Sequence, residues 1–322
     1  MIIPDNFKNI LITGGAGFIG SHIVDALLAA ETYVTVLDNL SAGKMEFLQK
    51  NLQNPKLKFI KGDLLIREDL DNAFQNQFDT VIHLAANPDI SLGIKDPTVD
   101  FNQTINATFN LLLKMKEKKI GKLIFFSGSG IYGDVGEKYT TENYGPLLPV
   151  SMYGASKLSA EALISAFSHL FGIKVWIFRP ANIVGNRATH GVVFDFINKL
   201  KMDPTTLQIL GDGNQSKSYL YIEDILDAVW LAINETNEPI NIFNLSSKSF
   251  VTVNEIAKIV IQVLGLNNVQ IQHTEGKVGW PGDVPIVRIE NKKMDDLGWK
   301  PKFNSSEAVR KTAQAISGQD AL

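Results

Sequence analysis

Short apolar segments alternate with amphipathic stretches from Asn9 to Phe126, and this alternation limits the folds that the 322-residue chain can adopt. Five apolar runs occupy residues 10–12, 33–37, 57–60, 80–84 and 122–126, and a sixth spans 174–178 after a helical stretch near 153–171. Strands that are apolar on both faces are typical of parallel sheets with helices on each side. The alternation therefore predicts an α/β fold with a doubly wound parallel sheet and right-handed crossovers.

The composition excludes several classes of protein. The chain has no cysteine, which rules out disulfides, thiolate catalysis and cysteine-ligated metals. Its five histidines show no ligand spacing, so we predict no metal site. The balance of 31 basic and 34 acidic residues gives no sign of a nucleic-acid binder. No apolar run approaches the roughly 18 residues of a membrane span, and the start, MIIPDNFKN, lacks the basic region of a secretory signal. We therefore expect a soluble, cytoplasmic protein with no membrane partner.

A glycine-rich turn follows the first predicted strand. Gly14, Gly17 and Gly20 are spaced three apart in TGGAGFIGS, residues 13–21. Gly14 permits a tight turn, Gly17 lets backbone N–H groups approach a pyrophosphate, and Gly20 lets the following helix pack on the sheet. We therefore expect this loop, together with Phe18 and Ile19 at the start of the helix, to bind a dinucleotide in a Rossmann-type domain.

Acidic residues end the second and third predicted strands. Asp38 lies 18 residues beyond Gly20, where a carboxylate can bind both hydroxyls of the adenosine ribose and repel a 2′-phosphate. No Arg or Lys follows Asp38 until Lys44, which favours NAD over NADP. Asp63 is placed to meet the adenine or, alternatively, to cap the next helix. The cofactor candidates at these two strand ends are Asp38, Asn39, Asp63 and Leu64.

A tyrosine and a lysine stand four residues apart in the later helical stretch. Tyr153 and Lys157, in YGASK, share one face of a helix. A nearby cation lowers the pKa of a phenol and makes tyrosine a usable general base. An isolated pair of this kind is common on ordinary helix faces. Downstream of a glycine loop, it indicates a catalytic base and the cation that activates it.

With these motifs the chain resembles the extended short-chain dehydrogenases/reductases, and within them the NAD-dependent sugar-nucleotide epimerases and dehydratases. It is most similar to the UDP-glucose (UDP-galactose) 4-epimerases. The likeness covers essentially the whole chain and rests on TGGAGFIGSH at 13–22, LDNLSAG at 37–43, GDL at 62–64, HLAANP at 83–88, YGASK at 153–157, RPANIVG at 179–185, HGVVFDFI at 190–197, LGDGNQSKSYLYIED at 210–224 and WPGDV at 280–284.

The resemblance implies roles for further residues. Tyr153 would take the proton of the sugar 4-hydroxyl while hydride passes from C4 to the nicotinamide, and Lys157 would bind the nicotinamide ribose. Other residues lining the cofactor site would be Leu84, Ala85, Ala86, Asn102 and Pro180. The nucleotide-sugar substrate would contact Asn87, Tyr153, Asn182, His190, Val192, Lys217 and Asp283, with Asn182 and Lys217 at the diphosphate and Asp283 at the uridine ribose.

Two positions depart from the family's pattern. A Ser or Thr that hydrogen-bonds the reacting oxygen usually stands shortly after the fifth strand, and in the register of Tyr132 that position is Gly128. Ser127 and Ser129 are therefore the candidates to supply the catalytic hydroxyl. Losing such a donor slows the chemistry by roughly 10²-fold or more. Trp280 stands where relatives often have Arg, which removes a charge partner of the diphosphate.

The distribution of Pro and Gly residues along the chain predicts two regions. Residues 1–180 are expected to form the NAD-binding domain, which the segment 217–245 rejoins, and residues 181–216 and 246–322 the sugar-nucleotide-binding region. The helices near 99–118 and 153–171 carry apolar stripes, which by resemblance imply a homodimer and otherwise cover the sheet. The lysines at 114–119 predict a solvated helix end.

The resemblance implies NAD-dependent 4-epimerisation of a UDP-hexose through a transient 4-keto sugar, with UDP-glucose and UDP-galactose or their N-acetyl forms as substrates. Three alternatives remain: a sugar-nucleotide reductase or dehydrogenase, a catalytically weakened binding relative because of Gly128, and an epimerase of GDP- or dTDP-linked sugars. Related dehydratases and decarboxylases carry a carboxylate just after the Ser/Thr position. This chain has Ser129 and Gly130 there, which argues against both reactions.

Overall fold

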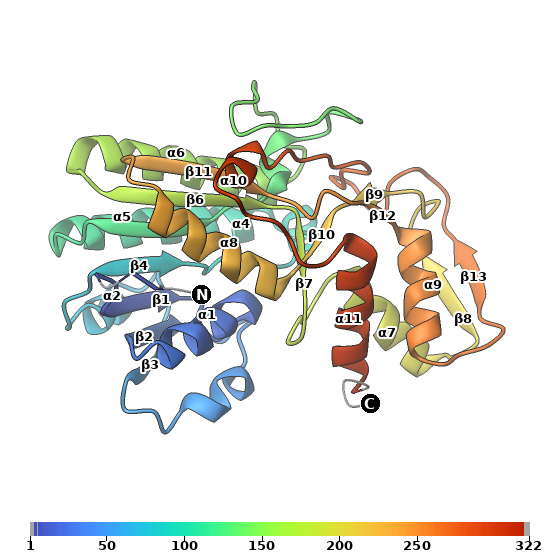
Figure 1. Ribbon diagram of the computed structural model, residues 1–322, viewed down its shortest axis with the longest axis horizontal. Coiled ribbons are helices and arrows are strands. Elements are labelled where there is room, and N and C mark those ends of the chain that lie inside the picture. The colour runs from blue at the N-terminus through green and yellow to red at the C-terminus, as the bar shows by residue number, and fades with distance from the viewer. Residues whose placement is uncertain (1–2, 5, 319–322) are drawn as a thin grey trace. The chain divides into compact units, whose positions relative to one another are not determined.

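Seven strands form one sheet in the computed structural model, which describes residues 3–4 and 6–318. Residues 1–2, 5 and 319–322, which belong to the two predicted regions, lie outside the described part. The strands are β1 (Asn9–Thr13), β2 (Tyr33–Asp38), β3 (Leu57–Lys61), β4 (Thr80–His83), β5 (Lys122–Phe126), β6 (Lys174–Pro180) and β11 (Ile240–Leu245). Their order, β11-β6-β5-β4-β1-β2-β3 (Figure 1), is that of a doubly wound Rossmann-type sheet. The predicted fold class is confirmed.

Parallel pairing brings the carboxyl ends of the central strands together. β1 pairs in parallel with both β2 and β4, with Thr13 opposite Leu37 and His83. β5 pairs in parallel with β4 and β6. The strand order reverses between β1 and β4. Ligands of such sheets bind outside the carboxyl ends of the strands at this reversal. The residues that follow β1, β2 and β4 therefore share one edge of the sheet.

Alternate residues of the central strands face two layers of helices. One face packs on α2 (Arg67–Ala73), α5 (Ala107–Glu117) and α6 (Met152–Phe171) through a buried cluster that includes Leu11 and Leu123. On the opposite face, α1 (Phe18–Ala29) packs against β1 and β2. There Phe7 meets the rings of Trp176 and Trp230 edge-on, and Trp230 belongs to α8 (Ile222–Glu235). Burial on both faces explains why these strands are apolar throughout.

The chain divides into two compact units. The first comprises Met1–Gly128, Ala155–Arg179 and Val229–Phe243, and the second Ser129–Gly154, Pro180–Ala228 and Asn244–Leu322. The helix α6 crosses from one unit to the other, so Tyr153 belongs to the second unit and Lys157 to the first. Residues 217–228 are part of the second unit, and most of β11 is part of the first.

The second unit contains short strand pairs and capped helices. Its strand pairs are β7 (Asn182–Val184) with β10 (Tyr219–Tyr221), β9 (Ser216–Lys217) with β12 (Val251–Thr252), and β8 (Thr206–Ile209) with β13 (Gln270–His273). Its helices include α7 (Val192–Met202), α9 (Val253–Val263), α10 (Lys292–Asp296) and α11 (Ser305–Ser317). Capping boxes formed by Thr252 with Glu255 and by Asn304 with Glu307 fix the starts of α9 and α11.

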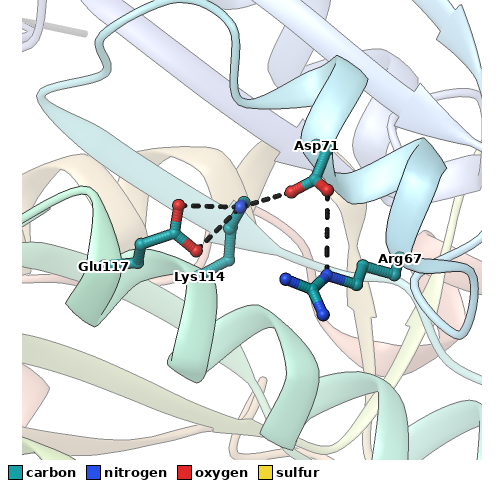
Figure 2. A network of polar contacts seen from close by, with 4 residues as sticks. All are labelled: Arg67, Asp71, Lys114 and Glu117. Carbon is teal, nitrogen blue, oxygen red and sulfur yellow. Dashed lines mark hydrogen bonds and ion pairs between the residues drawn. The ribbon is translucent and has the colours of Figure 1, made fainter.

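One lysine at the end of α5 differs from its prediction, whereas Lys116 and Lys119 are exposed as expected. Lys114 is buried rather than solvated, and its ammonium contacts Asp71 of α2 and both carboxylate oxygens of Glu117, at 2.8 and 2.9 Å (Figure 2). Arg67 contacts the same Asp71 at 3.9 Å. The sequence pattern missed this because the partner carboxylate comes from a distant helix. The network joins α2 to α5.

Short helical segments follow β4. They are α3 (Leu92–Lys95), α4 (Pro97–Asp100) and a π-helical turn (Phe101–Asn106) that leads directly into α5. Two 3₁₀ turns span Met45–Asn51 and Ser129–Tyr132. Within residues 3–4 and 6–318, the helices are all too short or too polar to cross a lipid bilayer.

Candidate active site

The glycine loop between β1 and α1 is built on close backbone approaches. Gly14 has a φ of +73°, and a Cβ there would lie 2.7 Å from the backbone nitrogen of Ala85. A Cβ at Gly20 would overlap the carbonyl oxygen of Gly14. Side chains are therefore excluded from both positions. This agrees with the roles predicted from the sequence, in which Gly14 permits the tight turn and Gly20 the packing of the helix.

The amino end of α1 faces this loop without a side-chain cap. Gly17 is the N-cap residue, and it makes no side-chain hydrogen bond that caps the helix. The N–H groups of that turn, together with the helix dipole, favour a bound anion. Phe18 is buried and Ile19 half-buried in the same turn. The loop therefore has the form of a pyrophosphate site.

Asp38 stands at the carboxyl end of β2 with both carboxylate oxygens directed by the backbone. Oδ2 accepts a hydrogen bond from the N–H of Ala16 at 2.9 Å, and Oδ1 accepts one from Leu40 at 2.8 Å. Burial raises the pKa of the Asp38 carboxyl, and these two N–H groups oppose the rise. A Cβ at Gly43 would lie 2.7 Å from Oδ1, so the loop after β2 closes around the carboxylate.

The other residues predicted at these strand ends also interact. The Asn39 amide donates to Asp63 Oδ2 at 2.9 Å, and the backbone N–H of Asp63 is held by Asp69 at 2.8 Å. Leu64 is buried beside them. Asp63 Oδ1 accepts from the backbone N–H of Leu65 in the turn before α2. The structure therefore brings Asn39 and Asp63 together at one end of the sheet.

A buried histidine anchors the end of β4. His83 Nδ1 contacts Thr13 Oγ1 at 2.6 Å, and its Nε2 contacts Thr108 Oγ1 of α5 at 3.0 Å. Burial, together with the charge of Lys157, lowers the pKa of His83 to about 3. His83 is therefore neutral and serves as a core residue. It ties β1 to α5 beneath the partly buried residues Leu84, Ala85 and Ala86.

Lys157 is almost fully buried on α6. Its ammonium donates to the carbonyl oxygen of Phe126, at the end of β5, at 2.9 Å, and lies 5.1 Å from the ring centre of Phe125. Burial lowers the pKa of Lys157 to about 8, while Asp100 and Glu161 oppose that change. The bond to Phe126 aims the ammonium at the carboxyl end of the sheet.

Tyr153 lies one turn before Lys157 on the same helix and is half-buried. The loop after β5 runs closely past it, since a Cβ at Gly130 would lie 3.9 Å from Tyr153 Cδ1. A Cβ at Gly154 would lie 2.5 Å from the carbonyl oxygen of Gly130. The missing side chain at Gly154 therefore lets the loop lie directly against the tyrosine turn.

This close approach makes Gly154→Ala destabilising. We expect the added methyl group, which would also lie 3.0 Å from Pro149 Cβ, to lower the free energy of unfolding by about 1–3 kcal/mol, as overpacking does. Urea denaturation measures the change. Gly121→Ala is the control, because a Cβ at Gly121 would meet nothing within 4 Å. Equal midpoints for the two variants would contradict the close approach.

The second unit joins several predicted substrate residues. Lys217 Nζ forms an ion pair with Asp283 Oδ1 at 2.6 Å, and Asp283 Oδ2 accepts from the N–H of Gly279 at 3.2 Å. The same ammonium lies 5.7 Å from the ring centre of Trp280. Lys217 and Asp283 were predicted to bind different parts of the substrate, and the structure pairs them directly.

The remaining predicted residues occupy separate places. In the second unit, Asn182 opens β7, where its side chain hydrogen-bonds to the hydroxyl of buried Tyr219, and burial raises the pKa of that phenol. His190 is exposed and contacts Thr189, and Val192 begins α7. Pro180 is buried at the end of β6. In the first unit, Asn102 accepts from Asn106 within the π-helical turn, and Asn87 is buried.

Sequence reasoning missed two residues that bear on this site. No sequence motif assigned a role to Tyr219, whose hydroxyl hydrogen-bonds to the Asn182 side chain. Asp100 is fully buried and accepts a hydrogen bond from Asn87 at 3.1 Å. An acidic residue in a short helix is normally solvated, so no pattern in the sequence marked Asp100. Residues 3–4 and 6–318 contain no group of three His, Asp or Glu side chains arranged to hold a metal ion.

The first unit has the parts that NAD requires. An uncapped helix end and a side-chain-free loop suit a pyrophosphate, and the Asp38 carboxylate suits a ribose diol and disfavours a 2′-phosphate. Lys157 donates to the carbonyl oxygen of Phe126 at the carboxyl end of β5. The residues therefore fit NAD.

Comparison with known proteins agrees with this geometry. The sequence profile of the NAD dependent epimerase/dehydratase family matches residues 10–246. A solved UDP-galactose 4-epimerase is 37% identical, with a TM-score of 0.85 over 97% of this chain and 100% of its own. The UDP-glucose 4-epimerase of Thermotoga maritima, solved with UDP-glucose, is 31% identical with a TM-score of 0.86 over 97% and 99%.

A third structure extends the likeness to a cofactor complex. The UDP-glucose 4-epimerase of Thermus thermophilus, solved with NAD, is 33% identical, with a TM-score of 0.85 over 98% of this chain and 100% of that one. The family profile spans the glycine loop, Asp38 and the Tyr153–Lys157 pair. The chain therefore belongs to the NAD-dependent epimerase/dehydratase family of extended short-chain dehydrogenases/reductases.

Proposed function

We propose that this protein catalyses the NAD-dependent 4-epimerisation of a UDP-hexose through a transient 4-keto sugar. The observation that carries the proposal is the pair on α6, in which the half-buried Tyr153 phenol stands one turn from a buried lysine whose pKa is about 8. The glycine loop and Asp38 supply the cofactor site that this chemistry requires. Similar proteins solved with UDP-glucose and with NAD support the choice of substrate and cofactor.

Tyr153 acts as the general base at the sugar 4-hydroxyl. Bound NAD supplies the hydride acceptor and donor for C4 of the sugar. As the C4 hydrogen leaves with its electron pair, the hydroxyl proton passes to the Tyr153 oxygen, and a ketone forms. Lys157 stabilises the phenolate because a nearby cation lowers the pKa of a phenol. After the keto sugar rotates in the site, the hydride returns to the opposite face of C4 and Tyr153 returns the proton. The cycle therefore consumes no proton or electron.

The second unit supplies the contacts to the nucleotide. We assign Asn182 and Lys217 to the diphosphate and Asp283 to the uridine ribose. Support comes from the ion pair between Lys217 and Asp283, which holds both side chains in a fixed place beside Trp280. His190 and Val192, at the start of α7, are assigned to the substrate loop, and Asn87 to the sugar.

Ser127 is the hydroxyl that we assign to the reacting 4-oxygen in place of Gly128. Its backbone N–H donates to the carbonyl of Phe178 at 2.8 Å, but its buried Oγ has no hydrogen-bond partner among the described residues. Buried hydroxyls normally have a partner, so a substrate oxygen is the group that would satisfy it. Ser127 also directly follows Phe126, whose carbonyl holds Lys157.

Alanine variants separate the two candidate serines. We expect Ser127→Ala to lower kcat by about 10²-fold, the cost of removing one donor to a developing oxyanion. Ser129 is only partly buried in its 3₁₀ turn, so Ser129→Ala should lower kcat much less. Steady-state rates with UDP-glucose measure both. A larger loss for Ser129→Ala would move the role to that residue.

The reaction itself is tested by proton NMR of the anomeric region. Purified protein with NAD would be incubated separately with UDP-glucose, UDP-galactose and their N-acetyl forms, and with Tyr153→Phe protein as a control. Interconversion of one pair, absent from the control, is the expected result. Unchanged sugars in a protein that still binds NAD and UDP would contradict 4-epimerisation of UDP-sugars. That result would favour the alternative that this protein is a catalytically weakened relative that only binds the sugar nucleotide.

We further propose that the protein is a cytoplasmic homodimer that pairs through α5 and α6. Apolar side chains on these helices remain exposed in the chain, among them Phe109 at 40%, Leu113 at 44% and Leu170 at 71%. Exposed apolar side chains favour burial against a partner. Leu170→Glu is expected to yield monomers in light scattering, and a dimer that persists in this variant would exclude this face.

A further inference from the structure

Two lysines stand side by side where β5 and β6 begin. Lys122 is the first residue of β5 and Lys174 the first of β6, and the parallel pairing places these two residues opposite each other. Neighbouring strands lie about 4.8 Å apart, and residues in register present their side chains on the same face. Like charges in such positions repel each other. Positive charge is therefore concentrated at the amino ends of the strands, the edge of the sheet opposite the glycine loop.

Both lysines line one cavity of the first unit, with a volume of about 370 Å³. Phe7, Trp176 and residues 233–237, where α8 ends, also line it. Lys122 Nζ lies 4.8 Å from the ring centre of Phe7, and Lys174 Nζ lies 4.5 Å from that of Trp176. At about 30 Å³ for each water, this volume would hold about a dozen water molecules. The cavity therefore has room for a small molecule beside the two ammonium groups.

The contacts within the protein use only part of the hydrogen-bonding capacity of the two ammonium groups. Lys122 Nζ donates to the carbonyl oxygen of Asn6 at 3.3 Å. Lys174 Nζ donates to the carbonyl oxygen of Thr236 at 3.2 Å and to Oδ1 of Asn237 at 2.5 Å. Each ammonium carries three N–H donors. Among the described residues these contacts leave two donors on Lys122 and one on Lys174 for a ligand.

Burial and mutual repulsion both act against the two charges. Burial lowers the pKa of both ammonium groups, and the charge of Lys122 contributes to the lowering at Lys174. Asp79 opposes this change at Lys122, and Glu238 opposes it at Lys174. However, two backbone N–H groups at the start of β1 hold Oδ2 of Asp79, and Glu238 is exposed, as is Glu235 in the cavity wall. An anion bound between the two ammonium groups would offset both the burial and the repulsion.

We propose that this cavity is a second ligand site of the protein, which binds a phosphate-bearing anion between the ammonium groups of Lys122 and Lys174. A phosphomonoester carries a charge of about −1.5 to −2 at pH 7 and three strong acceptor oxygens, which match the two charges and the remaining N–H donors. A small group on the phosphate would lie against the rings of Phe7 and Trp176. The site lies at the opposite edge of the sheet from the glycine loop, and the inference does not depend on the reaction proposed above.

Isothermal titration calorimetry of the NAD-saturated protein tests the site, because NAD then occupies the glycine loop. Phenyl phosphate and inorganic phosphate are titrated separately at constant ionic strength. We expect saturable binding, and we expect Lys122→Gln and Lys174→Gln each to weaken it by about tenfold or more, the cost of losing a charged hydrogen bond. Tighter binding of phenyl phosphate would identify an organic phosphomonoester as the occupant, and tighter binding of inorganic phosphate would identify the ion itself. Absence of saturable binding of either probe would overturn the inference.

Two control variants remove the same charge elsewhere. Lys8 is exposed and lies next to Phe7 in the chain but does not line the cavity, and Lys217 belongs to the proposed diphosphate site. Lys8→Gln and Lys217→Gln should both keep the affinity of the parent protein. Weakening by Lys8→Gln equal to that by Lys122→Gln would reduce the effect to net charge and overturn the inference. Weakening by Lys217→Gln alone would place the anion in the sugar-nucleotide site, with the same consequence.

Thermal unfolding provides a second readout that needs no turnover. A ligand that binds the folded protein raises its Tm. With NAD present, phosphate should raise the Tm of the parent protein above its value in chloride at equal ionic strength, and should raise that of Lys122→Gln less. Lys122→Gln removes a single hydrogen bond within the described part of the protein, so it keeps the test valid if Lys174→Gln does not fold. An equal rise in the parent and in Lys122→Gln would contradict the site.

Discussion

Replacing Tyr153 with phenylalanine is expected to lower kcat for 4-epimerisation by about 10²–10⁴-fold, the usual contribution of a positioned general acid–base group. In the proposed mechanism the phenol carries the proton in both directions, and no second hydroxyl on α6 stands one turn from Lys157 toward the amino end of the helix. Phenylalanine keeps the ring that packs near Gly130. The fold and the binding of UDP-sugar should therefore be retained.

The comparison requires both a rate and a binding measurement. Calorimetric titration with UDP should give similar affinities for the variant and the parent protein, while the rate falls. Tyr139→Phe is the matched control, since Tyr139 is a tyrosine that is 58% exposed and packs on Phe250 through its ring. A Tyr153→Phe protein with nearly full activity would assign the base to another group.

Removing the carboxylate of Glu161 is expected to have the largest effect on stability. Glu161→Ala would leave the buried guanidinium of Arg179 without its bidentate partner. Breaking a buried pair from one side costs about 3–5 kcal/mol. Urea denaturation of the NAD-free protein should show this loss in the free energy of unfolding.

The double variant Glu161→Leu with Arg179→Met provides the control. Replacing both members by apolar residues of similar volume is often neutral or stabilising, so most of the loss should be recovered. If Glu161→Ala and the double variant lose the same amount, the cost comes from packing rather than from an uncompensated charge.

The sheet could be predicted from sequence because its signal is local. The central strands are buried on both faces, so they are largely apolar, whereas Lys58 and Lys61 of the edge strand β3 are exposed. A side chain at Gly20 is excluded by the backbone of the same turn, and one at Gly14 is excluded by the backbone of Ala85. The strand, turn and helix of the loop are contiguous in the chain. The same holds for Tyr153 and Lys157, which share one helix face.

The site's remaining interactions depend on residues that are far apart in the chain. Nothing near Asp100 in sequence shows that its carboxylate is buried with one oxygen that lacks a partner among residues 3–4 and 6–318. Lys217 and Asp283 form an ion pair through strands and loops that only the fold brings together. Lys114 is buried because Asp71 reaches it from α2. Composition and periodicity predict which faces of helices and strands are buried. They do not predict which charged side chains form pairs.

The central claim is that hydride leaves C4 of the sugar and returns to the same carbon. UDP-glucose deuterated at C4 tests it, in ordinary water with unlabelled NAD in excess, with the UDP-galactose formed analysed by proton NMR and mass spectrometry. We expect the product to retain deuterium at C4. UDP-galactose with protium at C4 would contradict the account, because the label would then have exchanged with water or with free cofactor.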